Sequence, residues 1–147
     1  PDCPPMPKWL EPGEYLGNAK EGQVHVVSPH PYMRLHSQMA NAEPLRKTYA
    51  VQTREPLLIN TQDAKKRGIR DGDLVELYNE RGALVVGAQV SDRIMPGVVG
   101  MPHAHRREIV DGVDIGANAN TLSGHHWSPI SKNCPSTGST LVQVEKA

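Results

Sequence analysis

Histidine is the side chain in this sequence with the most direct capacity for chemistry. His103 and His105 flank Ala104, and His125 is followed by His126. Imidazole is the commonest protein ligand of zinc and copper. A His-x-His pair without a third ligand at a matching spacing does not define a metal site. The sequence therefore predicts no metal site, and we expect these histidines to serve pH-sensitive loop packing or a contact between domains.

The acidic and sulfur side chains do not define a reaction centre either. Asp71 and Asp73 flank Gly72, an order typical of a turn, and no nucleophile paired with a base accompanies them. Cys3 and Cys134 lie at opposite ends of the chain without a Cys-x-x-Cys spacing, so we expect neither a zinc site nor a disulfide. The common glycine-rich phosphate loops are missing. No catalytic residue is predicted within this chain.

Length and charge restrict the class of protein. The chain has 147 residues, which suits one domain, and a domain of this size buries about 68–70% of its extended-chain surface. Lysine plus arginine equals aspartate plus glutamate at 16 each. We therefore expect no binding to nucleic acid and no membrane contact by this domain. The apolar runs are far shorter than the ~20 residues that span a bilayer, and a start at Pro1 rather than methionine suggests a piece of a longer protein.

Proline sets the first division of the chain. Residues 1–20 contain five prolines. Because proline lacks a donor and keeps the preceding residue extended, this stretch is predicted to be a linker or a surface strap. The domain itself is predicted to occupy residues 21–147.

Short strands and turns fill that domain. Apolar alternation predicts strands at 23–28, 57–60, 83–90 and 139–145, with others around Val75 and after residue 97. Asn60 and Gly68 have the residue types that begin and end a short helix. Residues 79–82 are predicted to form a hairpin turn in which Gly82 supplies a positive φ. About six strands with one small helix predict a closed barrel, and residues 102–136 a long ordered loop.

Residues 68–82, Gly-Ile-Arg-Asp-Gly-Asp-Leu-Val-Glu-Leu-Tyr-Asn-Glu-Arg-Gly, resemble the carboxy-terminal cofactor-binding domain of the molybdopterin oxidoreductases related to dimethyl sulfoxide reductase. Further motifs follow in that family's order between residues 22 and 146: Arg34-Leu-His-Ser-Gln38, Leu58-Ile-Asn-Thr-Gln-Asp-Ala64, Met95-Pro-Gly-Val-Val99, Asn120-Thr-Leu-Ser123 and Pro129-Ile-Ser-Lys132. The motif at residues 34–38 is most similar to its counterpart in the trimethylamine N-oxide, dimethyl sulfoxide and biotin sulfoxide reductases. The resemblance implies a mainly-β fold, a six-stranded double-psi β-barrel (ADC-like) with short helices.

The resemblance also implies a cofactor and partners. The family reduces or oxidises small substrates at molybdenum, or tungsten, held by bis(molybdopterin guanine dinucleotide). The protein ligand of the metal, a serine in the oxide reductases, belongs to an earlier domain, so this chain would share the cofactor with the remaining domains of a parent oxidoreductase. It would not be catalytic alone. A periplasmic location is implied in the same way.

Eight residues are implied to contact the cofactor by their positions in the family's motifs. Hydroxyl, amide and cationic donors that converge from one loop suit pyrophosphate and pterin edges, and an arginine binds phosphate through two parallel hydrogen bonds. An asparagine amide donates to a pterin carbonyl and accepts from a ring nitrogen at once. The predicted residues are Met33, Arg34, His36, Ser37, Gln38, Asn120, Thr137 and Ser139. Lys132 also lies at a family position, where it would meet a phosphate or an acidic neighbour.

Two alternatives remain open from the sequence. The same domain occurs in nitrate, sulfur-compound and arsenic oxyanion oxidoreductases, and residues 102–107 depart from the Gly-Trp-rich form of the oxide reductases. The chain could instead be an independent, non-catalytic β-barrel interaction module. The cofactor hypothesis predicts that residues 33–38 and 118–123 line one concave surface, whereas the interaction module predicts that they are scattered.

Overall fold

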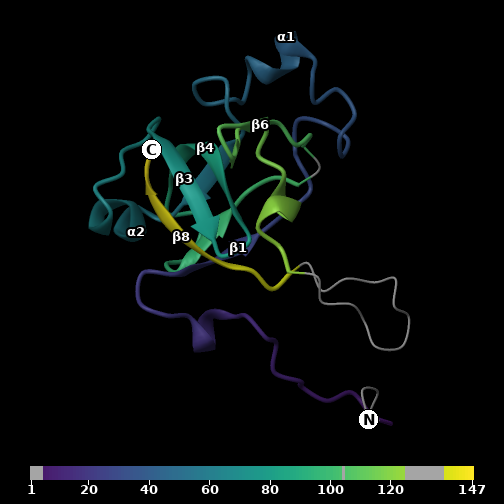
Figure 1. Ribbon diagram of the computed structural model, residues 1–147, viewed down its shortest axis with the longest axis vertical. Helices are drawn as coiled ribbons and strands as arrows, with labels where there is room; N and C mark the ends of the chain where they lie inside the picture. Colours follow the sequence, from purple (N-terminus) through teal and green to yellow (C-terminus); the bar gives the residue numbers. More distant parts are fainter. Residues whose placement is uncertain (1–4, 104, 125–137) are drawn as a thin grey trace.

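The computed structural model describes residues 5–103, 105–124 and 138–147. Its strands are β1 Val24–Val27, β2 Pro56–Ile59, β3 Leu74–Asn79, β4 Gly82–Val90, β5 Val98–Gly100, β6 Ile109–Val110, β7 Val113–Asp114 and β8 Leu141–Lys146. Its helical elements are η1 Leu16–Asn18, α1 Glu43–Arg46, α2 Thr61–Lys66 and η2 Ala119–Thr121, of which η1 and η2 are 3-10 turns. The described chain is mainly β with short helices, as predicted (Figure 1).

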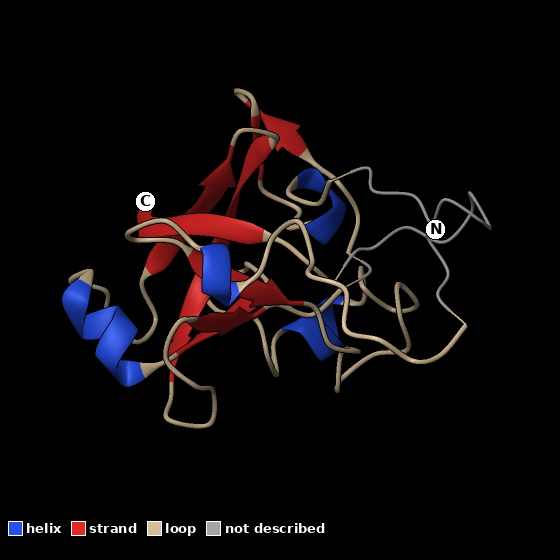
Figure 2. Cartoon of the chain, turned by 90° about the horizontal axis from the view of Figure 1, so that it is seen from below, coloured by secondary structure: helices blue, strands red, loops and turns tan. Residues whose placement is uncertain are grey.

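Six of the strands close into a barrel. β2 pairs with β5, β5 with β1, β1 with β8, β8 with β3 and β3 with β4, and β4 pairs again with β2. Among these six pairs, β1–β5 and β2–β4 are parallel and the others antiparallel. Figure 2 shows the strands crossing around a common centre, with α2 on the outside. The predicted closed barrel is confirmed.

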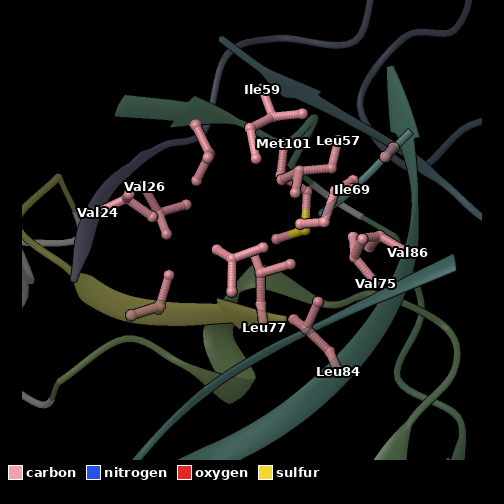
Figure 3. Packing of buried hydrophobic residues seen from close by; sticks show 14 of the residues in the cluster. Val24, Val26, Leu57, Ile59, Ile69, Val75, Leu77, Leu84, Val86 and Met101 are labelled. Carbon is pink, nitrogen blue, oxygen red and sulfur yellow. The ribbon is translucent and has the colours of Figure 1, made fainter. Parts of the chain in front are cut away.

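The centre of the barrel is filled by apolar side chains at every second position. Val75 and Leu77 of β3 and Leu84 and Val86 of β4 are all fully buried, at 0% exposure. They point inward together with residues of β1 and β2 (Figure 3). Successive side chains of a strand face opposite sides, and burying one such side chain contributes about 1.5–3 kcal/mol. The period-two pattern of the sequence therefore selects the inner face.

The helix predicted after β2 is α2. The side-chain oxygen of Asn60 accepts a hydrogen bond from the backbone N–H of Gln62 at 2.8 Å, which satisfies one of the free donors at the helix start. Gly68 takes a left-handed φ of 67° just after the helix end. In the described part of the chain no helix is long and apolar enough to cross a membrane.

The two aspartates after α2 form a turn, as predicted. Asp71 Oδ1 accepts the N–H of Val90 at 2.9 Å, and Asp73 Oδ2 accepts the N–H of Arg70 at 2.9 Å. The second bond, together with a neighbouring lysine, lowers the pKa of Asp73. Gly72 between them has a φ of 84°, which favours glycine. Both carboxylates therefore hold the entry into β3 rather than a reaction centre.

The explanation predicted for Gly82 is wrong. The β3–β4 hairpin turns at Glu80 and Arg81, but Gly82 does not have a positive φ. A Cβ atom on Gly82 would lie 2.9 Å from Thr121 Cγ2 and 3.0 Å from the Thr121 carbonyl oxygen. Glycine is required here because another segment of the chain passes against the hairpin.

The expectation of an unbroken loop over residues 102–136 is also wrong for its described part. β6 and β7 form a hairpin within it, and β7 adds to the sheet by pairing with β4 in parallel, Asp114 opposite Leu84. Asp111 and Gly112, with φ values of 49° and 86°, make the turn. Two-residue hairpin turns favour Asp-Gly because both residues need positive φ, so the sequence did carry this signal.

The segment that precedes the barrel is hydrogen-bonded to it by the carboxylate of Glu14. Glu14 accepts two hydrogen bonds from the Arg81 guanidinium, at 2.7 and 2.9 Å, and one from the N–H of Leu141 at 2.7 Å. Residues 5–13 extend away from the barrel (Figure 1). The division of the chain at residue 20 stays a prediction.

We expect Gly87→Ala to destabilise the barrel by about 1–3 kcal/mol, because overpacking forces a backbone shift. A Cβ atom on Gly87 would lie 2.3 Å from Val51 Cβ and 2.9 Å from the Val51 carbonyl oxygen. Urea denaturation measures the loss. Gly13→Ala is the matched control, since a Cβ atom there meets nothing within 4 Å. Equal stability of the two variants would contradict the packing described here.

Candidate functional site

Two joined clefts lie on either side of residues 118–123. The first, of about 400 Å³, is lined by Val26, Ser28, His103, Asn118, Ala119, Asn120, Leu122, Ser123 and Thr140. The second, of about 360 Å³, is lined by Arg81, Arg107, Asn118, Asn120, Thr121 and Ser123. The shared residues Asn118, Asn120 and Ser123 form the ridge between them. The polar groups of this ridge thus face two concave surfaces at once.

The turn η2 sets the orientation of Asn120. The side-chain oxygen of Asn118 caps the turn by accepting the backbone N–H of Asn120 at 3.0 Å. The Asn120 residue is exposed, and within the described ranges no hydrogen bond engages its side-chain amide. An amide carries both donors and an acceptor. Asn120 is therefore available to a ligand, while Asn118 is partly committed to the turn.

A buried aspartate holds this turn in place. Asp114 has 0% exposure. Its carboxylate accepts the N–H groups of Glu108, Gly116 and Asn118 and the hydroxyl of Thr121, each at 2.9 Å. A buried charge is tolerated only when it is hydrogen-bonded. Asp114 was not predicted from the sequence, because neither its residue type nor its neighbours indicate that all four donors converge on it.

Arg34 is placed where it does not contact either cleft. Its side chain is 0% exposed, and its guanidinium donates to Glu55 Oε2 at 3.0 Å and to the carbonyl oxygen of His36. The guanidinium thus crosses its own loop and joins it to a carboxylate of the barrel. In this arrangement Arg34 orients the loop of residues 33–38.

Glu55 is the centre of a buried polar network. Its carboxylate also lies 3.5 Å from Arg46, 3.4 Å from His105 Nε2 and 3.1 Å from the Tyr49 hydroxyl. Burial, and then the charge of Glu55, raise the pKa of Tyr49. The network joins the loop of residues 31–54 to the segment that contains His105. Nothing in the sequence distinguishes Glu55 from a surface glutamate, so it was not predicted.

The other predicted residues of this loop are dispersed. His36 is exposed and lies beside the first cleft, since its Nδ1 is 3.1 Å from Nε2 of His103. Met33 borders a separate, mainly apolar pocket of about 230 Å³ with Arg34. Ser37 and Gln38 are exposed and border neither cleft. None of residues 33–38 lines either cleft, so the predicted single concave surface shared with residues 118–123 is not found; only His36 lies beside the first cleft, through its contact with His103.

Of the two residues predicted near the end of the chain, Ser139 lies within the described residues and Thr137 does not. Ser139 is half-buried next to Thr140, which lines the first cleft. Thr137 lies outside the described residues. The same holds for several other residues considered above: Cys3, His125, His126, Lys132 and Cys134.

His103 and Arg107 line the clefts, and neither was predicted to contact the cofactor. His103 was considered for metal binding, loop packing or a contact between domains, and it lines the first cleft. Arg107 is exposed, lines the second, and makes no ion pair among the described residues. The run His105-Arg106-Arg107 was a visible cationic signal, but only the fold brings it near residues 118–123.

A closed barrel that presents amide, imidazole and guanidinium groups along joined clefts has the form of a ligand-binding domain. Residues 24–140 match the family model described as "Molydopterin dinucleotide binding domain". The chain belongs to this family of molybdopterin dinucleotide-binding domains. The family identified from the sequence motifs is confirmed.

Two curated relatives that this chain resembles are much longer than it is. Over 99 residues it is 52% identical to a dimethyl sulfoxide/trimethylamine N-oxide reductase from Cereibacter sphaeroides, covering 67% of this chain and 12% of that protein. Over 155 residues it is 37% identical to a trimethylamine-N-oxide reductase from Haemophilus influenzae, covering 99% of this chain and 18% of that protein. The chain thus spans less than a fifth of the length of these relatives.

A solved structure confirms the fold. The chain superposes on acetylene hydratase from Pelobacter acetylenicus with a TM-score of 0.77 and 19% identity, over 97% of this chain and 21% of that one. At this identity the likeness concerns the fold alone. Together with the strand pairings it confirms the six-stranded double-psi β-barrel.

We expect Glu55→Gln to destabilise the protein by roughly 3 kcal/mol, because it removes the buried negative charge that the Arg34 guanidinium contacts. The exchange preserves side-chain size, so the loss reports charge and hydrogen bonding. Thermal and urea unfolding measure it. The same exchange at Glu43, whose side chain is 77% exposed, is the control and should leave stability nearly unchanged. Similar values for both would mean that the network does not stabilise the fold.

We expect Asp114→Asn to destabilise the protein by about 3 kcal/mol, because the new NH₂ group faces backbone N–H donors that lose their acceptor. The turn that carries Asn120 should loosen, which amide hydrogen exchange of residues 116–121 would detect. Asp111→Asn is the matched control. Asp111 is exposed with a φ of 49°, a conformation that asparagine tolerates. Unchanged protection in the Asp114 variant would exclude the anchoring role.

Proposed function

We propose that this chain contacts bis(molybdopterin guanine dinucleotide) within a molybdenum oxidoreductase that reduces small N- or S-oxides. The observation that carries the proposal is the exposed Asn120 amide on the ridge between the two clefts, in a chain of the dinucleotide-binding family. The relatives named above as dimethyl sulfoxide and trimethylamine N-oxide reductases support the substrate class.

The groups along the ridge suit the parts of such a cofactor. The Asn120 amide can donate to a pterin carbonyl and accept from a ring nitrogen. Arg107 borders the second cleft, where a guanidinium would bind phosphate. Arg81 lines the same cleft, but its donors hold Glu14 and the carbonyl oxygen of Leu122. We therefore assign phosphate contact to Arg107 and a supporting role to Arg81.

The loop of residues 33–38 has a corrected role in this proposal. His36, Ser37 and Gln38 are exposed and offer imidazole, hydroxyl and amide donors. Arg34 holds this loop in place through its buried ion pair with Glu55, and we assign it no phosphate contact. Met33, Ser139 and Thr137 stay proposed contacts on the strength of their positions in the family's motifs. The protein ligand of the metal, molybdenum or tungsten, would come from another domain of the parent enzyme.

The remaining domains of a parent oxidoreductase are the proposed partners. Tyr32, Leu35 and Met39 are 97%, 65% and 63% exposed, although all three are large apolar side chains. Their exposure within one short loop supports a contact of this loop with another protein surface. The proposal includes a periplasmic parent enzyme, which the resemblance to the oxide reductases supports. It includes no nucleic acid and no membrane contact by this domain.

The polypeptide that contains this chain should carry the cofactor and the activity. Purified from its native source, it should be several times larger than this chain, contain molybdenum or tungsten, and release guanine nucleotide on acid hydrolysis. With a reduced dye it should reduce trimethylamine N-oxide or dimethyl sulfoxide. A native protein of this length free of pterin and metal would favour the interaction module. A loaded enzyme active only on nitrate or an arsenic oxyanion would replace the substrate class and keep the domain role.

In that parent enzyme, Asn120→Ala should lower the cofactor content, because it removes a polar partner worth about 1–3 kcal/mol when buried against the pterin. Molybdenum per polypeptide and reductase rate give the measurement. Asn41→Ala is the matched control, since Asn41 is exposed and lines neither cleft. Full occupancy with an unchanged rate in the Asn120 variant would refute the assigned contact.

A further inference from the structure

Three histidine rings that are distant in sequence meet beside the first cleft. His30 and His36 follow β1, and His103 follows β5. One nitrogen from each ring lies within 4.8 Å of the other two. The ring centroids are 4.7 Å apart for His30 and His36, 4.5 Å for His30 and His103, and 5.3 Å for His36 and His103. This cluster was not predicted from the sequence, where His103 lies next to His105 and far from His30 and His36.

A hydrogen bond fixes which nitrogen of His103 faces the cluster. Nδ1 of His103 lies 3.2 Å from the carbonyl oxygen of Ser28. A carbonyl oxygen only accepts, so Nδ1 carries the hydrogen in this contact and leaves the Nε2 lone pair directed at His36 Nδ1, 3.1 Å away. Metal-bound histidines commonly donate their other N–H to such an oxygen, which fixes the ring orientation.

The backbone holds two of the three rings on paired segments. The N–H of His103 donates to the carbonyl oxygen of Pro29 at 3.1 Å, and the N–H of Met101 donates to that of Val27 at 3.0 Å. These bonds extend the parallel β1–β5 pair up to His30 and His103. His36 reaches the cluster from the next loop, in a left-handed conformation with a φ of 50°. The ring positions therefore follow largely from the barrel itself.

We propose that His30, His36 and His103 bind one divalent transition-metal ion of the zinc class. Imidazole nitrogen suits zinc, copper and nickel. Zinc–nitrogen bonds of about 2.0–2.1 Å in a tetrahedral site place the nitrogens roughly 3.3 Å apart. The observed nitrogens are already within 4.8 Å, and one pair is at 3.1 Å. Small side-chain rotations complete a three-histidine site whose fourth position is open to water.

Metal binding at this site is expected when the chain has no dinucleotide bound. His36 is in the segment proposed above to contact the cofactor, so the ion and the cofactor would use one side chain. The metal proposal itself does not require the cofactor proposal, because metal binding is measured without any pterin. A negative result for metal binding would therefore not contradict the cofactor proposal, and a negative result for cofactor binding would not contradict the metal proposal.

The test is a titration of the full 147-residue chain, stripped of metal, with Co²⁺ followed by visible absorption and with Zn²⁺ by calorimetry. We expect one ion per chain and the intense visible bands of tetrahedral cobalt. His30→Ala, His36→Ala and His103→Ala should each weaken binding by at least about 100-fold, since even the loss of an outer-shell partner costs 10–100-fold. Circular dichroism of each variant separates loss of the site from loss of the fold.

His25→Ala is the matched control. His25 lies on β1 and its Nε2 contacts the carbonyl oxygen of Gly138 at 2.9 Å, so it is not part of the cluster. This variant should bind as the unaltered chain does. Absence of saturable binding by the folded chain would overturn the proposal. So would binding that survives all three cluster substitutions, which would place the ion on other residues such as His125 and His126.

Discussion

The parallel pairing of β2 with β4 is the constraint on which the rest of the structure depends. It joins the first and last of the six barrel strands, with Pro56 opposite Gly87 and Ile59 opposite Val90, and so closes them into a barrel. Closure satisfies the backbone groups that an open edge would expose. It also encloses the apolar faces of the six barrel strands in one core (Figure 3). Glycine is needed at position 87 because the turn at Val51 crosses the sheet there.

Glu55 lies at the first step of this pairing and connects closure to the site. Its carbonyl oxygen accepts the N–H of Gly87 at 2.9 Å, while its carboxylate holds the guanidinium of Arg34 and lies close to Arg46. A buried ion pair is weak evidence for net stability, because desolvation offsets its attraction. Its geometry is nevertheless specific. The network therefore fixes where two long loops leave the barrel, and so where the exposed donors of residues 36–38 stand.

A second buried carboxylate performs the same task for the turn that presents Asn120. Asp114 collects the donors of the turn that presents Asn120, and it reaches that position because β7 pairs with β4. The two loops that carry candidate ligand groups are thus each held by a buried acid. The ligand groups themselves remain exposed on the ridge and at the rim. The candidate ligand groups are therefore open to solvent, whereas the two carboxylates that hold their loops are buried.

The sequence by itself determined the features that depend on neighbouring residues. The cap at Asn60, the left-handed Gly68, the turn at Asp71 to Asp73 and the alternation of β3 and β4 are all local, and each was predicted. The order of motifs also identified the family, because those local patterns recur together in it.

Only the tertiary structure decided the features that depend on distant residues. Gly82 is glycine because of Thr121, Arg34 is turned inward because of Glu55, and His30 meets His103 because β1 pairs with β5. Burial and long-range pairing set these contacts, and no spacing along the chain encodes them. The same reason separates Asn120, whose exposure on the ridge agrees with its predicted role, from Arg34, whose residue type suggested a phosphate contact but whose position gives it a supporting one.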